Sequence, residues 1–427
     1  MTDRNAATII IGGGIVGLAS AFELSQRGRR VVLLEAGAEL AAETSFGPGG
    51  IFTPSMPEPW NGPGVAAHLW EGLTNPASAM RLRWSALPTL VGWGLRFLYH
   101  SAPRRHRVST LANFLLCNFS TRVMREWRDS QGLQFDSVDA GSLKLFRDSA
   151  SMAVPIATAR WLAEHGLRFE VLDAAQTVAR EPLLESIRND IAGAIYYPDD
   201  SRGDCRAFAL GLARLASQRG VDIRTNAKAT RLMVEGNKVV GVEADGAHIA
   251  ARNVVLSVAT AGPRLLAPLG LTLPVRPAKG YSVTISIPGD NRIPAIPVID
   301  DALHAAVVPL GNRIRLAGTA EFAGEDRSID PARTANLKAL MAGVYPDLAA
   351  DLDKATTTEW TGLRPMSADG RPFIGETRIP GLWLNTGHGH LGLTMAAGSA
   401  VLLADLMQRG IPAIDPTPYS AIRRPLA

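Results

Sequence analysis

The chain has 427 residues, 46% of them hydrophobic and 20% charged, which is the composition of a globular protein with about two or three domains. Intrinsic disorder as the dominant state is excluded, because it requires few apolar residues and a high net charge, and the formal charge here is only +4. The two cysteines, Cys117 and Cys205, are too few for a disulfide framework and argue against a structural zinc site, so we expect no bound metal.

The arginines gather in short clusters, such as residues 27–30 and 104–107, which predict a solvated basic surface and no nucleic-acid partner. The apolar run at residues 6–24 is broken by glycines and lacks the cationic flank of a signal peptide, and the run at 87–98 is too short to span a bilayer. We expect a cytoplasmic protein, free or in peripheral contact with the inner face of the membrane. Residues 69–107, rich in Trp, Leu and Arg, are the candidate for that contact, although a pair of core helices is the plainer interpretation.

In chain order, the first elements predict a nucleotide-binding unit. Residues 8–11 are a short β-branched run typical of a buried strand, and residues 15–27 have the apolar spacing of a helix, which Gly28 ends. Residues 31–34 predict a second strand. A strand, a glycine turn, a helix and another strand form the unit that opens a parallel sheet.

The turn carries the pattern G-x-G-x-x-G at Gly12, Gly14 and Gly17, and Glu35 follows about 20 residues later at the end of the second strand. Gly12 permits a tight turn, Gly14 lets the backbone approach a diphosphate, and Gly17 allows close packing of helix on strand. The N–H groups at the helix start attract the diphosphate, and Glu35 favours a free ribose hydroxyl over the 2′-phosphate of NADP. The residues expected at this dinucleotide are Gly12, Gly14, Ile15, Val16, Gly17, Glu35 and Ala36.

The middle of the chain favours FAD over NAD. Residues 229–235, 239–243 and 254–258 predict a three-stranded antiparallel piece, as in flavoproteins with a split nucleotide domain. The sequence Glu-Thr-Ser at residues 43–45 predicts a second loop within reach of the diphosphate. Further FAD contacts are expected from Thr44, Ser45, Gly49, Gly50, Ala229, Ala259 and Gly262.

Several further motifs match a known family. They are Gly203-Asp204-Cys205, Lys279-Gly280-Tyr281-Ser282, the stretch Trp-Thr-Gly-Leu-Arg-Pro-Met at 360–366, Asp369-Gly370, the stretch 384–392, and Thr394-Met395. Together with the glycine turn they span almost the whole chain. On these residues the chain resembles the small subunit of bacterial D-amino acid dehydrogenases, within the D-amino acid oxidase and glycine oxidase superfamily.

The resemblance implies an α/β fold with a Rossmann-like FAD-binding domain of the glutathione-reductase type. It also implies an inserted, discontinuous α+β substrate domain built on a mainly antiparallel sheet. We assign residues 1–60, 190–265 and 345–427 to the FAD-binding domain, and residues 61–189 and 266–344 to the substrate domain.

The activity implied by the resemblance is the oxidative deamination of D-amino acids with noncovalent FAD. Hydride would pass from the α-carbon to the flavin, the product would be a 2-oxo acid and ammonia, and a quinone or another acceptor would take the electrons. The match to the family's Gly-Leu-Arg-Pro motif places Arg364 on the substrate carboxylate, which a guanidinium grips in a bidentate fork. Tyr281 is the second expected contact, and His390 lines the pocket or is structural.

The glycine-rich turn at residues 387–392 opens the last predicted helix, and N–H groups at a helix start stabilise negative charge on reduced flavin. The flavin contacts expected there are Gly389, Leu391, Gly392 and Thr394.

The chain departs from the family pattern at residues 48–51, Met56, His390 and Leu393, which alters the expected pocket near the substrate side chain. Three alternatives stay open, and the altered pocket motivates the first of them. In the first, the substrate is a cyclic imino acid such as D-proline or hydroxy-D-proline. In the second, the enzyme is an oxidase that uses oxygen. In the third, the chain is a flavin-holding subunit that carries electrons for a partner.

Overall fold

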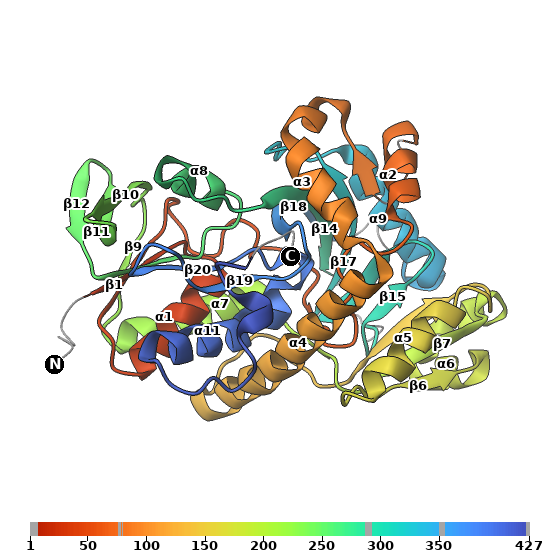
Figure 1. Cartoon of the computed structure of the whole chain (residues 1–427). Coiled ribbons are helices and arrows are strands. Elements are labelled where there is room, and N and C mark those ends of the chain that lie inside the picture. The colour runs from red at the N-terminus through yellow and green to blue at the C-terminus, as the bar shows by residue number, and fades with distance from the viewer. Residues whose placement is uncertain (1–6, 76–77, 79, 287–292, 350–354, 424–427) are drawn as a thin grey trace.

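The computed structural model describes residues 7–75, 78, 80–286, 293–349 and 355–423, and it contains two large sheets that lie side by side (Figure 1). The six-stranded sheet has the order β19 (Phe373–Glu376), β20 (Leu382–Thr386), β13 (Asn253–Leu256), β1 (Thr8–Ile11), β2 (Val31–Leu34) and β9 (Asp222–Arg224). The nine-stranded sheet has the order β18 (Thr356–Ser367), β14 (Val275–Ser286), β17 (Arg313–Phe322), β16 (Ala305–Leu310), β15 (Val298–Asp300), β5 (Ser142–Phe146), β7 (Gly193–Tyr197) and β6 (Glu170–Leu172), with β4 (Met80–Leu82) beside β17.

Two smaller sheets and the helices complete the fold. The smaller sheets are β10 (Ala229–Glu235), β11 (Lys238–Ala244) and β12 (Ala247–Ala250), and β3 (Ile51–Phe52) with β8 (Ser201–Arg202). The helices are α1 (Ile15–Gln26), α2 (Val65–Thr74), α3 (Leu87–His100), α4 (Pro103–Gln131), α5 (Ala153–Ala163), α6 (Ala174–Arg180), α7 (Cys205–Gln218), α8 (Gly262–Leu266), α9 (Pro331–Val344), α10 (Pro346–Ala349) and α11 (Gly392–Gln408).

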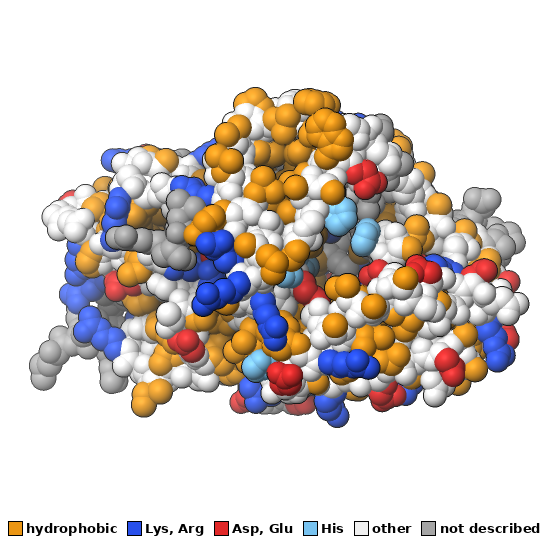
Figure 2. Space-filling view, turned by 45° about the vertical axis from the view of Figure 1, so that its right-hand side comes forward, with side chains coloured by type: hydrophobic (Ala, Val, Ile, Leu, Met, Phe, Trp, Pro, Cys, Tyr) orange, Lys and Arg blue, Asp and Glu red, His pale blue; other side chains and the backbone are white. Residues whose placement is uncertain are grey.

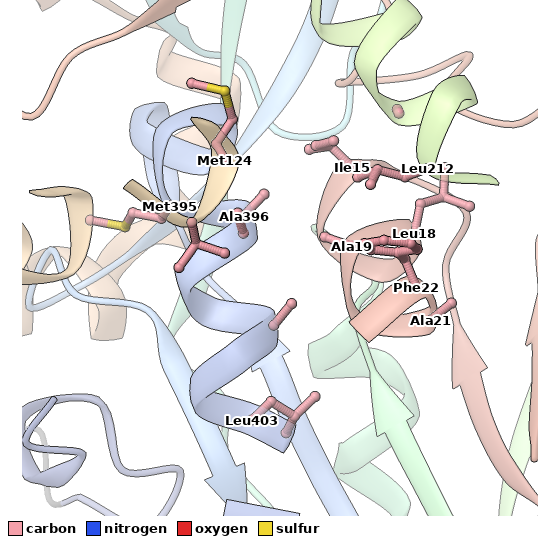
Figure 3. Close-up of a cluster of buried hydrophobic side chains, with 14 of the residues drawn as sticks. Ile15, Leu18, Ala19, Ala21, Phe22, Met124, Leu212, Met395, Ala396 and Leu403 are labelled. Carbon is pink, nitrogen blue, oxygen red and sulfur yellow. The ribbon is translucent and has the colours of Figure 1, made fainter. Parts of the chain in front are cut away.

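The six-stranded sheet is buried on both faces, as a sheet of mostly parallel strands requires. Ile10 of β1 points into a core shared with α1, α4, α7 and α11, whereas Ile9 and Ile11 point to the opposite core beneath β10–β12 and α8. Figure 3 shows the first of these cores, in which Phe22 of α1 and Leu403 of α11 face the interior. This packing fixes the start of α1 at the carboxyl end of β1.

The helix α11, together with the turn before it, is long and apolar enough to cross a membrane by length and composition alone. The segment is Gly389–Gln408, and 72% of the relevant window is buried within the protein. Its contacts with α1 and α4 account for its apolar composition, because a helix that is hydrophobic all round is buried.

The α/β class and the mainly antiparallel second sheet are confirmed, but three segments differ from the sequence-based expectation. Residues 254–258 do not form the third antiparallel strand: β12 does, and β13 instead joins β1 as a parallel strand. The strands β7 and β18 lie in ranges that we assigned to the FAD-binding domain, yet they pair in the nine-stranded sheet. Strand pairing between distant segments decides these positions, and short apolar runs do not encode it.

A buried carboxyl group joins the nine-stranded sheet to the loop that follows β3. Asp200 accepts hydrogen bonds of 2.6 Å from the hydroxyls of Ser55 and Ser142, and its side chain is fully buried. Burial raises the pKa of Asp200 to about 7, although the two hydroxyl groups oppose the shift. The folded protein therefore binds a proton that the unfolded chain releases between about pH 4 and pH 7.

Because the folded state holds this extra proton, the free energy of unfolding should fall as the pH rises from 4 to 7, by up to about 4 kcal/mol. Asp200→Asn should remove most of that slope, measured by urea unfolding at several pH values. Asp190→Asn, at an exposed acid, is the control and should leave the slope unchanged. An Asp200→Asn protein with the original slope would contradict this account.

Candidate active site

The glycine turn between β1 and α1 lies beside the carboxyl ends of β1, β2 and β13. Gly12 has φ +112°, a conformation that favours glycine, and a Cβ there would lie 2.8 Å from the carbonyl oxygen of Ser257. A Cβ on Gly17 would overlap the carbonyl oxygen of Gly12. The helix can approach the strand this closely only because both positions are glycine.

The first turn of α1 presents N–H groups to an anion, and Gly14 caps it without a side chain. The N–H of Ile15 donates to Ser45 Oγ at 3.0 Å, which brings the predicted second loop to the helix start. Val16 follows in the same turn. The predicted second loop therefore lies at the helix start, and contact of Gly14, Ile15 and Ser45 with a diphosphate remains a prediction.

Glu35 ends β2 beside this turn. Its carboxylate oxygens accept the N–H groups of Gly13 at 2.7 Å and Gly37 at 2.8 Å, which fixes the side chain with lone pairs left for further donors. Ala36 follows as an exposed residue. The arrangement fits an adenosine ribose whose hydroxyls donate to the carboxylate.

Ser257 supports the same fit, since its buried Oγ has no hydrogen-bond partner among the described residues. The residues present thus suit FAD: a helix start for the diphosphate, a carboxylate for the ribose, and an unpaired hydroxyl at the turn. Ser257 was not predicted, because residues 254–258 had been assigned to a different sheet.

The remaining predicted FAD contacts lie on both sides of this turn. Thr44 Oγ1 donates to the carbonyl of Leu363 in β18 at 2.9 Å, so the loop reaches the nine-stranded sheet. Gly49 lies against that sheet, and Gly50 accepts the N–H of Gly203. Ala229 begins β10, two residues after Ala227, whose N–H donates to the carbonyl of Glu35. Ala259 follows β13, and Gly262 is buried at the start of α8; the contacts of Ala229, Ala259 and Gly262 with FAD remain predictions.

Arg364 lies on the face of the nine-stranded sheet that meets this loop. In the register of β14 with β18, Ala278 pairs with Arg364, Gly280 with Gly362, and Ser282 with Trp360. Ser282 Oγ donates to the carbonyl of Gly47 at 2.7 Å, which shows that this face points toward the FAD-binding side. Side chains at alternate positions of β18, including Arg364, therefore point the same way.

The guanidinium of Arg364 lies over Gly280, where a Cβ would overlap it. Its Nη1 donates to the carbonyl of Thr319 at 3.1 Å, and it makes no ion pair with any described residue. Burial lowers the pKa of Arg364 to about 10, so the group stays protonated at neutral pH. A partly buried cation without a carboxylate partner is suited to an anionic ligand.

Trp60 and His390 complete the surroundings of Arg364. The rings of Trp60 and His390 stack with centroids 5.3 Å apart and 20° between planes, and the Arg364 guanidinium carbon lies 5.3 Å from the Trp60 ring centroid. Burial, followed by the charge of Arg364, lowers the pKa of His390 to about 3. His390 is therefore neutral at physiological pH, and its ring, stacked on Trp60, lies near the Arg364 guanidinium. Trp60 comes from a loop and had no recognisable sequence signal.

The structure contradicts the predicted role of Tyr281. Its hydroxyl donates to Glu321 Oε2 at 2.7 Å, and its ring is buried in a core formed with Val283 and α9. Side chains of a strand alternate between faces, so Tyr281 lies on the face opposite Gly280 and Arg364. We therefore exclude Tyr281 from the substrate contacts.

The turn before α11 reaches the same region. Gly389 has φ +58°, and a Cβ there would lie 3.3 Å from the sulfur of Met366, two residues from Arg364. Leu391 is buried, Gly392 starts α11, and Thr394 Oγ1 accepts the N–H of Thr53 at 3.1 Å. His388 is structural, because its Nε2 bonds Ser399 Oγ at 2.8 Å inside the core.

Comparisons of the sequence with known proteins identify FAD-dependent relatives, in agreement with the residues that suit FAD. A family model described as FAD dependent oxidoreductase matches residues 7–406. The D-amino acid dehydrogenase of Cereibacter sphaeroides is 38% identical over 409 residues, which cover 95% of this chain and 93% of that protein. The D-amino acid dehydrogenase of Paramagnetospirillum magneticum is 37% identical over 400 residues, covering 93% and 94% of the two chains.

Solved structures share the fold at lower identity. Glycine oxidase from Geobacillus kaustophilus has a TM-score of 0.75 at 24% identity, covering 98% of this chain and 100% of that one. L-Proline dehydrogenase from P. horikoshii has a TM-score of 0.77 at 17% identity, covering 99% and 97%. The match over residues 7–406 shows that the chain belongs to the FAD-dependent oxidoreductase family.

Proposed function

We propose that the protein is an FAD-dependent D-amino acid dehydrogenase. The observation that carries this proposal is the protonated guanidinium of Arg364, which has no ion pair with a described residue and lies where the FAD-binding side meets the nine-stranded sheet. An amino acid always brings a carboxylate that such a group can bind in a fork. Relatives at 37–38% identity that are named D-amino acid dehydrogenase support the substrate class and its stereochemistry.

When bound, FAD supplies the acceptor for the hydride of the substrate's Cα–H bond. The chain's own residues would bind and orient the substrate. Arg364 fixes the carboxylate, and Trp60 with His390 limits where the side chain can lie. Because His390 is neutral, it adds no positive charge beside Arg364.

The N–H groups of the turn before α11 would support negative charge on reduced flavin.

Cys117 is buried in α4 and Cys205 in α7, which supports noncovalent binding of FAD. We propose a quinone or another carrier as the electron acceptor. A panel of D- and L-amino acids, scored by anaerobic loss of flavin absorbance and by dye reduction, tests the proposal: turnover limited to L-amino acids, or none at all, would overturn it.

A cyclic D-imino acid is the second candidate substrate. The observation that favours it is the flat stack of Trp60 and His390 beside the carboxylate anchor, which suits a ring held close to its own carboxylate. Including D-proline and hydroxy-D-proline in the panel separates the two candidates by their ratio of kcat/KM.

Arg364→Ala should lower kcat/KM by roughly 30- to 5,000-fold, because losing one partner of a buried, hydrogen-bonded charge pair costs about 2–5 kcal/mol. The measurement is steady-state dye reduction on protein whose flavin spectrum is unchanged. Arg276→Ala, at a cation elsewhere in the same sheet, is the control and should keep normal kcat/KM. Equal effects of the two substitutions would contradict the role of Arg364.

Gly280→Ala tests the position of the guanidinium without removing it. The new methyl group would overlap the guanidinium and displace it from its place over β14, so KM should rise by about 10-fold or more, since misplacements near 1 Å are costly. Gly343→Ala, where nothing lies close to the added Cβ, is the matched control. An unchanged KM in Gly280→Ala would show that the position of Arg364 over Gly280 does not matter for binding.

Glu35→Gln should weaken FAD binding by about 10- to 150-fold, since a hydrogen bond to a charged acceptor contributes about 1.5–3 kcal/mol. The dissociation constant of FAD follows from flavin fluorescence on the apoprotein. Glu39→Gln, at a largely exposed carboxylate nearby, should bind FAD as before. If both variants bind FAD equally, Glu35 does not hold the ribose.

A further inference from the structure

Thr319 lies in a bulge of β17, opposite the glycine that Arg364 covers. The register of β14 with β17 shifts at this point, so that Thr319 and Ala320 both lie opposite Gly280. The guanidinium of Arg364 lies over the same glycine. The bulge therefore brings Thr319 next to the expected carboxylate anchor, although 45 positions separate the two residues in the sequence.

The backbone of Thr319 is strained. Its φ of +51° lies in the left-handed region, which a β-branched residue rarely adopts and which costs free energy. In a regular strand its carbonyl would lie in the plane of the sheet and bond a neighbouring strand. Here the carbonyl instead accepts a hydrogen bond of 3.1 Å from Arg364 Nη1. The unusual backbone of Thr319 thus helps to hold the guanidinium in place.

The hydroxyl of Thr319 is buried without a partner. Its Oγ1 makes no hydrogen bond with any described residue. Other threonines near it are satisfied, since Thr361 Oγ1 donates to the carbonyl of Gly280 at 2.9 Å. Thr284 Oγ1 likewise accepts a hydrogen bond of 3.0 Å from Arg315. Because buried polar atoms are nearly always hydrogen-bonded, the unpaired hydroxyl of Thr319 requires an explanation.

The packing of the sheet explains the bulge but not the hydroxyl. The extra residue in β17 brings Glu321 to the face on which Tyr281 lies, where the two side chains form a hydrogen bond of 2.7 Å. That pairing needs only a small residue at the position of Thr319. Glycine would adopt a positive φ there with less strain, so a threonine indicates a use for its hydroxyl.

A carboxylate bound to Arg364 lies within reach of this hydroxyl. Covalent geometry keeps the Thr319 hydroxyl within about 5 Å of its own carbonyl oxygen, which is itself bonded to the guanidinium. A carboxylate has about four lone-pair sites and a guanidinium fork uses two of them, which leaves room for a hydroxyl donor. The protein surface differs: Figure 2 shows Lys and Arg side chains lying among Asp and Glu side chains, where solvent weakens the attraction of an anion.

We propose that Thr319 is a further substrate-binding residue, whose hydroxyl donates to the carboxylate that Arg364 holds. This role rests on the proposed function, since it takes an amino acid as the ligand of Arg364. Both stereoisomers of an amino acid and its 2-oxo acid product have that carboxylate. The hydroxyl of Thr319 therefore contributes to the binding of all three, whereas its carbonyl positions the guanidinium.

The test compares variants of the FAD-loaded full chain by dye reduction and by calorimetric titration with pyruvate, a small 2-oxo acid. Thr319→Val removes the hydroxyl at nearly constant shape. It should raise KM and the dissociation constant of pyruvate by about 10- to 150-fold, with little change in kcat. Thr319→Ser keeps a hydroxyl and should restore most of the affinity. Thr319→Gly adopts the positive φ without strain, so it should fold and bind as weakly as Thr319→Val.

Thr357→Val is the matched control, because Thr357 is an exposed threonine of β18 on the face opposite Arg364. Its KM and its affinity for pyruvate should equal those of the unchanged protein. The proposal is overturned if Thr319→Val and Thr319→Gly keep the original values, if Thr319→Ser is as impaired as Thr319→Val, or if the unchanged protein binds no pyruvate. If the unchanged protein turns over only L-amino acids, or none, the proposed function fails, and the pyruvate titration still decides the role of Thr319.

Discussion

An arginine that has no carboxylate partner of its own is the feature on which the functional account depends. Arg364 is partly buried, its pKa is lowered by that burial, and its guanidinium donates a hydrogen bond to the backbone carbonyl of Thr319. Proteins rarely keep a cation in such a position without an anion, since the cost of removing its water must be offset. A ligand carboxylate supplies that anion, and the free energy of forming the pair also orients the ligand.

The six-stranded sheet positions the expected FAD-binding residues, and the nine-stranded sheet positions the expected substrate anchor. The six-stranded sheet ends in the glycine turn, where Gly12 and Gly17 allow α1 to approach and Glu35 is fixed by two backbone N–H groups. The nine-stranded sheet carries Arg364 on its facing side. The loop at residues 44–50 joins them, with Thr44 bonded to β18 and Ser45 bonded to α1. The dinucleotide cradle and the carboxylate anchor therefore hold a fixed relation to each other.

The sequence predicted the local parts of this site and missed those that depend on long-range packing. The turn, its helix and Glu35 follow from spacing within about 30 residues, and Arg364 came from a motif. Tyr281 was expected to contact the substrate but lies in the core beside Val283, because alternation along a strand does not say which face meets the cofactor. Trp60 and Ser257 were missed because contacts between segments far apart in the chain bring them to the site. The same limit explains why β13 and β18 joined other sheets than expected.

The most direct measurement of the central claim is a crystal structure of the FAD-loaded protein with a 2-oxo acid product bound. The account predicts that the product's carboxylate makes two hydrogen bonds with the Arg364 guanidinium and that its carbonyl carbon lies over the flavin ring. Trp60 and His390 would then border the product's side chain. A carboxylate bound to another residue, or an Arg364 distant from the flavin, would contradict the account.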